Sequence, residues 1–350
     1  MNLCKLCRIK DADDTGSHIV PHFLLKRIFN VKNAKGRDQE ISFKISAADI
    51  TMSFGRSVQP EKLEEVFGEL TDEELEAKAM ADLVVDNEWC KSCEKKFSDL
   101  ETFYAETLNT AKESEYQSSA DSLTTLMFWL SILWRCSVTQ KTAMRLSNKD
   151  EKTIRYLLNE FEPGKNNGGF SEKWRETLDQ ISYQIYRSPD YHTKIDDHHG
   201  AFLLLGKTRQ PYTMMVDEFT VLVYMKNSHT KLNLATFFGF EKLNGPFTND
   251  KGGEIVTPLT TAEYGAYIAK VFAFMKDLKL ARYISILDRL YRKIGHHGNM
   301  PKHIVNEIIT MMTSDEQKLG RKYTYKDFVN VTTKVVIKHH VELRRIRNTK

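Results

Sequence analysis

Four of the five cysteines fall into two C-x-x-C pairs, Cys4 with Cys7 and Cys90 with Cys93. Thiolates at this spacing are the ligands that a structural zinc ion takes in a tetrahedral site. Small zinc modules usually separate their two pairs by roughly 15–20 residues, whereas here residues 8 to 89 intervene. The second pair must therefore return from a long insertion. The repeated spacing favours one zinc site over four unrelated thiols.

The fifth cysteine and the apolar segments bear on the compartment. Cys136 lies in an apolar stretch and is expected to be a small buried hydrophobic residue. The first residues lack the basic and apolar regions of a secretory signal. The most apolar stretch, residues 123–134, has about half of the roughly 20 residues that a membrane span needs. We therefore expect a cytoplasmic protein without a membrane segment, whose reduced cysteines bind metal.

A histidine motif follows the first cysteine pair, and an acidic residue follows the second. The motif contains His18 and His22, and Glu94 comes directly after Cys93 at the start of an expected helix. Histidine titrates near neutral pH and suits general-base catalysis. His18 could equally be an ordinary strand histidine, and Glu94 could simply stabilise the helix N-terminus. The full motif reads Ser17–His18–Ile19–Val20–Pro21–His22–Phe23.

In this order, the motifs resemble the HNH (His-Me finger) endonucleases of treble-clef type. A branch of bacterial HNH-like proteins has approximately the pattern C-x-L-C…S-H-I-I-P-x-F…C-x-x-C-E-x-x-F-S-x-x-E. Residues 4–7, 17–23 and 90–101 fit this pattern, and residues 133–135 are similar to an aromatic helix of that branch. The resemblance covers about residues 1–140.

The resemblance implies a metal-dependent endonuclease that hydrolyses DNA phosphodiester bonds. His18 would take a proton from water as general base, and Glu94 would ligate Mg²⁺ or another divalent cation. Asn87 would take the place of the family's middle asparagine, with Asn30 as a rival. The zinc ion would only hold the strand and the helix in register. A phage-defence effector is the biological setting that the resemblance suggests.

One position departs from the family pattern. Ser17 stands where the family carries a metal-binding acid or histidine, and serine is a poor ligand for a divalent cation. Further cation ligands are therefore sought in His22 and in Glu101, which follows Glu94 by two helical turns on the same face. Ser17 also favours the alternative function, a non-catalytic zinc module that binds nucleic acid or a partner protein.

The charge distribution allows a nucleic-acid partner. The formal net charge is +4, but residues 61–88 contain eleven Asp and Glu against two Lys, so the rest of the chain is basic. A basic surface suits a polyanion, although dispersed Lys and Arg are also typical of a solvated face. We expect DNA as the partner, with a homodimer or a partner defence protein as further candidates. A dimer would make double-strand cutting simple.

Other histidine clusters are weaker metal candidates. Residues 196–199 read Asp-Asp-His-His, and histidine pairs occur at residues 296–297 and 339–340. Adjacent residues point in different directions on a helix or a strand, so one site rarely uses both. Solvated turns are the expected interpretation. Neither common phosphate-binding glycine motif occurs in the chain.

Hydrophobic periodicity predicts the elements that position the site. We expect a strand at residues 17–21, extended chain at 41–58, an acidic helix at 61–82, a helix at 91–112 and a buried helix at 122–138. Beyond a glycine-rich loop at 164–169, the pattern favours strands at 201–205, 219–225 and 232–238. It then favours helices at 261–278, 280–294 and 301–313, and a periodic basic segment from residue 325.

These elements predict an α+β fold with two domains. Residues 1–115 would form an N-terminal treble-clef (ββα-metal) zinc module with nuclease residues and an insertion at about 30–86. Residues 116–350 would form a larger, mainly helical domain with a few strands, used for recognition or regulation.

Overall fold

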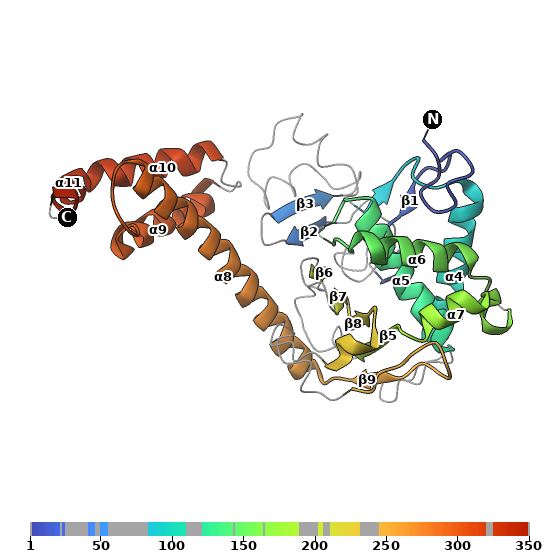
Figure 1. Cartoon of the computed structure of the whole chain (residues 1–350). Coiled ribbons are helices and arrows are strands. Elements are labelled where there is room, and N and C mark those ends of the chain that lie inside the picture. The colour runs from blue at the N-terminus through green and yellow to red at the C-terminus, as the bar shows by residue number, and fades with distance from the viewer. Residues whose placement is uncertain are drawn as a thin grey trace. The chain divides into compact units, whose positions relative to one another are not determined.

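A computed structural model of the chain has the mixed α+β fold that the sequence predicts (Figure 1). It describes residues 2–21, 23–24, 41–45, 50–54, 83–109, 121–142, 144–163, 165–188, 202–205, 211–231, 245–319 and 325–348. The contacts between backbone positions divide the chain into two compact units. One comprises Met1–Arg56 and Ala79–Val271, and the other Ser57–Lys78 and Phe272–Lys350. None of the helices in the described ranges is both long and apolar enough to cross a membrane.

The N-terminal part of the first unit contains a short hairpin and a helix. Strand β1 (Ser17–His18) pairs antiparallel with β4 (Val84–Val85), so that His18 lies opposite Val84. Helix α4 (Lys91–Asn109) follows and confirms the helix predicted from residue 91. β1 is shorter than the predicted strand. A second antiparallel hairpin, β2 (Ile41–Ile45) with β3 (Ile50–Phe54), lies within the predicted extended segment. The predicted helix at 61–82 lies outside the described residues.

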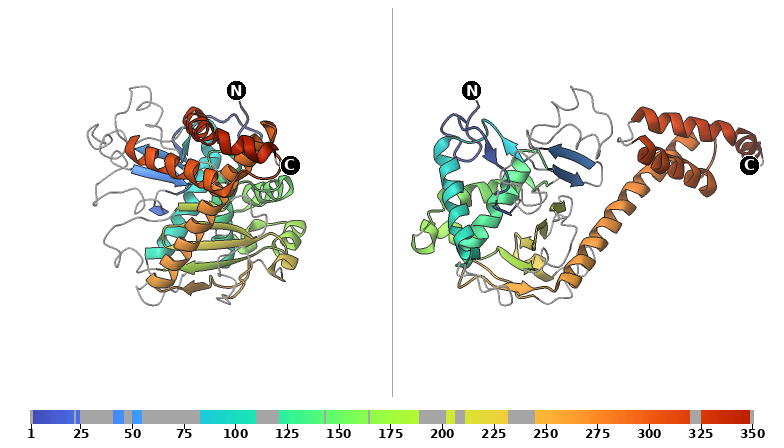
Figure 2. Two further views of the ribbon diagram at one scale, coloured as in Figure 1. Left: turned by 90° about the vertical axis from the view of Figure 1, so that its left-hand side faces the viewer. Right: turned by 180° about the vertical axis from the view of Figure 1, so that it is seen from behind.

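Helix α5 (Ser122–Val138) forms over the predicted residues and is buried along almost its whole length. Its residues are apolar nearly all round, which is typical of a core helix. It packs against α4 and against α6 (Asn148–Glu160), which the sequence analysis did not predict. Figure 2 shows these helices together from two further sides.

The first turn of α5 is capped by Asp121. Its carboxylate accepts hydrogen bonds from the Thr124 amide, at 2.8 Å, and from the Thr124 hydroxyl, at 2.6 Å. We expect Asp121→Ala to lower the free energy of unfolding by about 1 kcal/mol, because the amide loses its acceptor. Asp121→Asn keeps an oxygen acceptor, so its free energy of unfolding should stay within about 0.3 kcal/mol of the wild-type value. Urea denaturation checks both values, and equal losses in the two variants would contradict a capping role.

A five-stranded sheet in the order β6-β7-β8-β5-β9 completes the first unit. All neighbouring pairs are antiparallel except β5 with β9. The predicted strands at 201–205 and 219–225 are confirmed, while the one at 232–238 lies outside the described residues. The strands are β5 (Ser182–Arg187), β6 (Phe202–Leu205), β7 (Tyr212–Val216), β8 (Phe219–Tyr224) and β9 (Val256–Pro258).

Strands β5 and β7 were not predicted, and every residue in them is buried. A strand that is buried on both faces lacks the alternation of apolar and polar residues by which a half-exposed strand is recognised. Short helices lie around the sheet: α7 (Glu172–Leu178), the 3₁₀ turn η3 (Asn166–Gly169) within the predicted loop, and η4 (Asn227–Lys231) after β8.

One hydrophobic core joins the cysteine region to the sheet. Its members run from Cys4, through the aromatic residues of α4 and α5, to Met225 after β8. Trp89 and Trp134 lie at its centre with ring centroids 5.4 Å apart. Residues on both sides of position 115, the expected domain boundary, share this core.

The C-terminal part of the chain is helical. Helix α8 (Thr261–Lys293) is continuous where two helices were predicted, because neither Gly nor Pro occurs near the expected break at residue 279. It is followed by α9 (Lys302–Leu319), α10 (Tyr325–Lys338) and α11 (His340–Asn348). The second unit has its own core, which includes Leu287, Ile304, Ile308, Val335 and Leu343.

Candidate metal centre and active site

The first cysteine pair lies in a tight turn. Leu3 and Asp11 bridge the two sides of this turn, and the Cys4 amide donates to the Lys10 carbonyl at 2.8 Å. The Arg8 amide donates back to the Cys4 carbonyl at 2.9 Å, with Arg8 itself in the left-handed region at a φ of 58°. Backbone hydrogen bonds therefore hold the Cys4–Cys7 segment in a folded turn.

The second cysteine pair lies at the start of α4. The amides of Cys93 and Glu94 donate to the Cys90 carbonyl at 2.9 and 3.0 Å, so Cys90 directly precedes the helix and Cys93 stands in its first turn. A helix N-terminus carries partial positive charge and favours the thiolate form that binds metal.

The fold brings the two pairs together. The sulfur atoms of Cys4, Cys7, Cys90 and Cys93 all lie within 4.8 Å of one another, and the Cys7 and Cys90 sulfurs are 3.9 Å apart. Four sulfurs at the usual Zn–S distance of about 2.3 Å in a tetrahedron lie about 3.8 Å from one another. The four cysteines can therefore hold a metal ion such as zinc, as their spacing predicts. None of the chain's five cysteines forms a disulfide.

The electrostatics of the cluster reflect its crowding. The pKa of Cys4 is lowered to about 4 because the Cys93 thiol hydrogen-bonds to it. The pKa of Cys93 is raised, chiefly by the same hydrogen bond and by burial. Four thiols this close repel one another when ionised, so a bound cation would stabilise the thiolates.

Contacts outside the cluster attach the first pair to the rest of the unit. The Lys5 amide donates to the Glu88 carbonyl at 3.0 Å. Arg155 on α6 donates from Nη1 to the Leu6 carbonyl at 2.9 Å. The turn between Cys4 and Cys7 is therefore held against both the second pair and the helical core.

Arg135 connects the strand that carries His18 to helix α4. Its Nη1 donates to the His18 carbonyl at 2.6 Å, and its Nη2 forms an ion pair with Glu101 Oε1 at 2.7 Å. The guanidinium also lies over the Phe97 ring, 4.8 Å from the centroid. Arg135 is fully buried, so these contacts take the place of water around its charge.

Glu94 belongs to the same group of side chains. Its Oε2 is buried and has no hydrogen-bond partner among the described residues. Burial raises the pKa of Glu94, the charge of Arg135 opposes that rise, and the carboxylates of Glu101 and Asp14 add to it.

Ser17 is buried, and its hydroxyl donates to Asp14 Oδ2 at 3.0 Å. Hydrogen bonding between the Ser17 side chain and Glu94 also counteracts the rise in the pKa of Glu94. His18, directly after it on β1, has a half-buried side chain. The structure therefore brings the His18 carbonyl, Glu94 and Glu101 close to Arg135, although the strand and the helix lie far apart in the sequence.

The remaining predicted site residues lie elsewhere. Asn87 is exposed in the turn after β4, with a φ of 57°, and its amide donates to the Asp14 carbonyl at 2.7 Å. Asparagine tolerates this left-handed conformation better than most residues, which gives Asn87 a structural role in the turn. Asn87 does not take part in the contacts of Arg135 with His18, Glu101 and Phe97. His22 and Asn30 lie outside the described residues.

Sequence reasoning missed two members of the site. Asp14 was not among the predicted site residues, and Arg135 was noted only as part of an aromatic helix. A signal for Arg135 was present, because it is the single charged residue in the 17 residues of α5. A charge in a helix that is apolar on all sides requires a buried partner.

Within the described ranges, two groups of three or more side chains have metal-ligand geometry. One is the cysteine cluster, and the other is formed by His303, His339 and Glu342. His18, Glu94 and Glu101 do not form such a group. His296 stacks on Tyr291 with ring centroids 4.3 Å apart. Residues 196–199 lie outside the described part of the chain.

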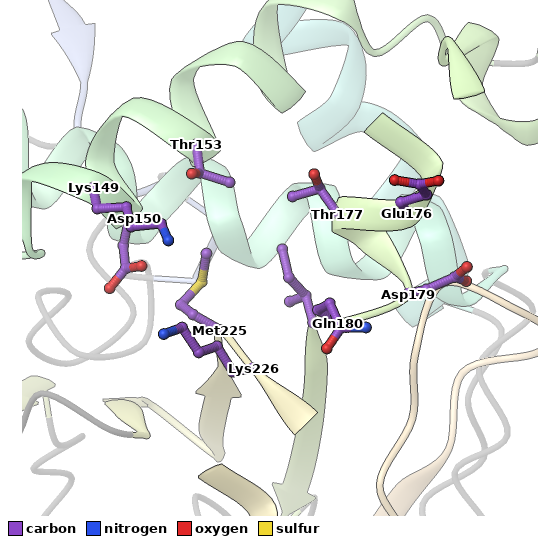
Figure 3. A pocket seen from close by; sticks show the side chains of 10 residues that line it. Lys149, Asp150, Thr153, Glu176, Thr177, Asp179, Gln180, Met225 and Lys226 are labelled. Atoms are coloured by element: carbon purple, nitrogen blue, oxygen red, sulfur yellow. The ribbon is translucent and has the colours of Figure 1, made fainter. Parts of the chain in front are cut away.

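A pocket of about 610 Å³ lies between α6, α7 and the end of β8 (Figure 3). Its lining carries both positive and negative side chains, and two of its carboxylates already have protein partners. Asp150 accepts from Tyr212 at 2.7 Å, and Asp179 pairs with Lys251 at 2.7 Å. This mixture indicates no single class of ligand. The charged residues that line the pocket are Lys149, Asp150, Glu176, Asp179 and Lys226.

Comparisons with protein-family models, with curated proteins and with solved structures found no match for this chain. The function is therefore inferred from the residues of the site and their surroundings.

Proposed function

We propose that the cysteine cluster holds one structural zinc ion in a treble-clef module. Three parts of the described structure support this proposal: the turn at Cys4–Cys7, the hairpin of β1 with β4, and α4 with the second pair at its start. A zinc ion bound to all four thiolates would join the turn to the helix and would leave no coordination position open for catalysis.

We further propose that this module carries the active site of an HNH-type endonuclease that hydrolyses DNA. The contact of Arg135 with both the His18 carbonyl and Glu101 is the observation that supports this function best. It ties the backbone that carries the proposed base to the helix that carries Glu94. His18 would accept a proton from the attacking water, a role for which histidine is the side chain most often used.

The donor chemistry of the site suits a divalent cation bound mainly by water and phosphate. Mg²⁺ commonly uses only one or two protein carboxylates besides substrate phosphates and water. Glu94 would hold the cation, because its buried Oε2 has no hydrogen-bond partner among the described residues. When bound, such a cation polarises the scissile phosphate and stabilises the leaving oxygen. Asp14 is close enough to affect the pKa of Glu94 and is a second candidate ligand.

Plasmid cleavage tests the proposal directly. We expect the full chain to nick plasmid DNA with Mg²⁺, Mn²⁺ or Ni²⁺, and EDTA to abolish the activity. His18→Ala should lower the cleavage rate by roughly 10²–10⁴-fold, the usual contribution of a general base. It should leave DNA binding unchanged, because the imidazole is not needed for contact with the phosphate backbone.

His297→Ala is the matched control, because His297 is exposed and lies in the second unit. It should cleave like the wild type. Metal-dependent cleavage that survives His18→Ala would refute the role of His18. DNA binding without cleavage under any of the three metals would favour the alternative described next.

The alternative is a non-catalytic zinc module that binds nucleic acid or a partner protein. Two observations favour it. Ser17 is buried against Asp14, and Glu101 is already paired with Arg135, so neither is poised to bind a cation. In such a module the only role of His18 and Glu94 would be to stabilise the fold. Their substitution would then change stability without affecting any enzymatic activity.

A further inference from the structure

A second cluster of metal-ligating side chains lies in the C-terminal helical unit. His303 stands in the first turn of α9, His339 lies at the junction of α10 with α11, and Glu342 is in the first turn of α11. One ligand atom from each of the three lies within 4.8 Å of the others. The cluster belongs to a different compact unit from the four cysteines.

The ligand atoms have the spacing of a metal coordination sphere. His303 Nε2 lies 3.1 and 3.2 Å from the two Glu342 carboxylate oxygens, and His339 Nδ1 lies 3.2 Å from Glu342 Oε2. Nitrogen and oxygen ligands at the usual distance of about 2.0–2.1 Å from a tetrahedral zinc ion are about 3.3 Å apart. A cation between the three side chains therefore needs little rearrangement.

A fourth residue orients His339 for this role. His339 Nε2 lies 2.8 Å from Glu307 Oε2, and Lys338 pairs with the other Glu307 oxygen at 2.6 Å. A cation that takes the place of the proton on Nδ1 would bind the Nδ1 lone pair beside Glu342, while the hydrogen on Nε2 would still be donated to Glu307. Histidines that bind metals usually donate their second ring nitrogen to a carboxylate in this way.

The second hydrophobic core fixes the positions of the ligands. Ile304 and Ile308 follow His303 and Glu307 directly on α9, and both are fully buried. Leu343 follows Glu342 and is also buried in this core. Each ligand on a helix therefore lies beside a side chain that packing holds in place. The ligands themselves remain open to solvent, with side-chain exposures of 55% for His303, 18% for His339 and 42% for Glu342.

We propose that His303, His339 and Glu342 bind a divalent transition-metal ion, Zn²⁺ in the first instance, with Glu307 as the positioning residue. Two imidazoles and one carboxylate favour Zn²⁺, Co²⁺ or Ni²⁺ over Mg²⁺ and Ca²⁺, which prefer oxygen ligands. Three protein ligands leave the fourth position to water. The ion joins α9 to the α10–α11 junction and stabilises the second unit.

Zinc stoichiometry in the full chain tests this site. Wild type dialysed against excess Zn²⁺ should bind two ions per chain. His303→Ala should bind one. Because the His303 side chain is largely exposed, this variant should keep the helical circular dichroism of wild type. Glu307→Gln should keep the second ion but weaken its binding by about 10–100-fold. His340→Ala is the matched control, since His340 is exposed next to His339 and lies outside the cluster; it should bind two ions.

Co²⁺ substitution distinguishes the two sites independently of function. The cysteine cluster gives a thiolate charge-transfer band, whereas the proposed site gives only the weaker visible bands of nitrogen and oxygen ligands. We expect the latter to disappear in His303→Ala and to persist in His340→Ala and Cys90→Ser. Equal metal binding by wild type and His303→Ala, or an equal loss in His340→Ala, would overturn the proposal.

Discussion

Cys90→Ser is expected to release the zinc ion from the N-terminal module and to destabilise the first unit by several kcal/mol. Apparent binding energies of structural zinc in zinc-finger peptides are about 10–16 kcal/mol, and much of this energy is folding energy. Cys90 supplies one of the four sulfurs, and its own sulfur lies 3.9 Å from that of Cys7. Serine does not replace a thiolate as a ligand, so the turn at Cys4–Cys7 loses its attachment to α4.

The measurements are zinc content by mass spectrometry and the thermal unfolding midpoint. We expect Cys90→Ser to lose one zinc equivalent relative to wild type. Its midpoint should fall by about 10 °C, given that 1 kcal/mol shifts a unit of this size by roughly 2–4 °C. The fall is limited because Cys4, Cys90 and their neighbours also belong to a large hydrophobic core.

Cys136→Ala is the matched control for this prediction. Cys136 is fully buried in α5 but is not a member of the metal-ligand cluster. It should retain the full zinc content, and its free energy of unfolding should fall by about 1 kcal/mol because one small buried side chain is shortened. Unchanged zinc content in Cys90→Ser would contradict a four-cysteine site.

Arg135→Met is expected to lower the free energy of unfolding by about 3–5 kcal/mol, the usual cost of removing one partner of a buried ion pair. Methionine fills much of the same space but carries no charge. Glu101 loses its ion-pair partner, the His18 carbonyl loses its donor, and Glu94 loses the nearby positive charge. If the proposed nuclease is correct, cleavage should fall as well, because β1 is no longer held beside α4.

Urea denaturation of three variants separates the charge from the shape of Arg135. Arg175→Met changes an exposed arginine and should stay within about 0.5 kcal/mol of wild type. Arg135→Lys keeps the charge but not the planar group that reaches two acceptors, and it should be intermediate. The double variant Arg135→Met with Glu101→Gln should recover part of the loss, because it leaves one fewer unpaired carboxylate. An Arg135→Met variant that is as stable as Arg175→Met would refute the ion-pair role of Arg135.

Local pattern was sufficient for several parts of this protein. The repeated C-x-x-C spacing identified the four cysteines that can hold a metal ion, because two thiols three residues apart reach one ion in any tight turn. The buried helix at 122–138 was predicted with its observed bounds, since the segment is apolar nearly all round. The helix starting at residue 91 was predicted equally well from its periodicity.

Features that depend on distant contacts could not be predicted in this way. Arg135 and His18 are 117 positions apart, and His303 and Glu342 are 39 apart. The pair at 339–340 was expected to lie in a solvated turn, but the His339 ring contacts His303 of another helix, with ring centroids 5.4 Å apart. Composition and spacing hold no information about which helix faces lie together.

The sequence by itself thus determined the chemistry available: four thiols, a strand histidine and an acidic residue at a helix start. Only the tertiary structure decided which groups meet. It engages Glu101 with Arg135, buries Ser17 against Asp14 and leaves one oxygen of Glu94 without a hydrogen-bond partner among the described residues. The physical reason is that ion pairs and coordination act over a few ångströms, whereas burial of the core, which sets those distances, depends on the whole chain.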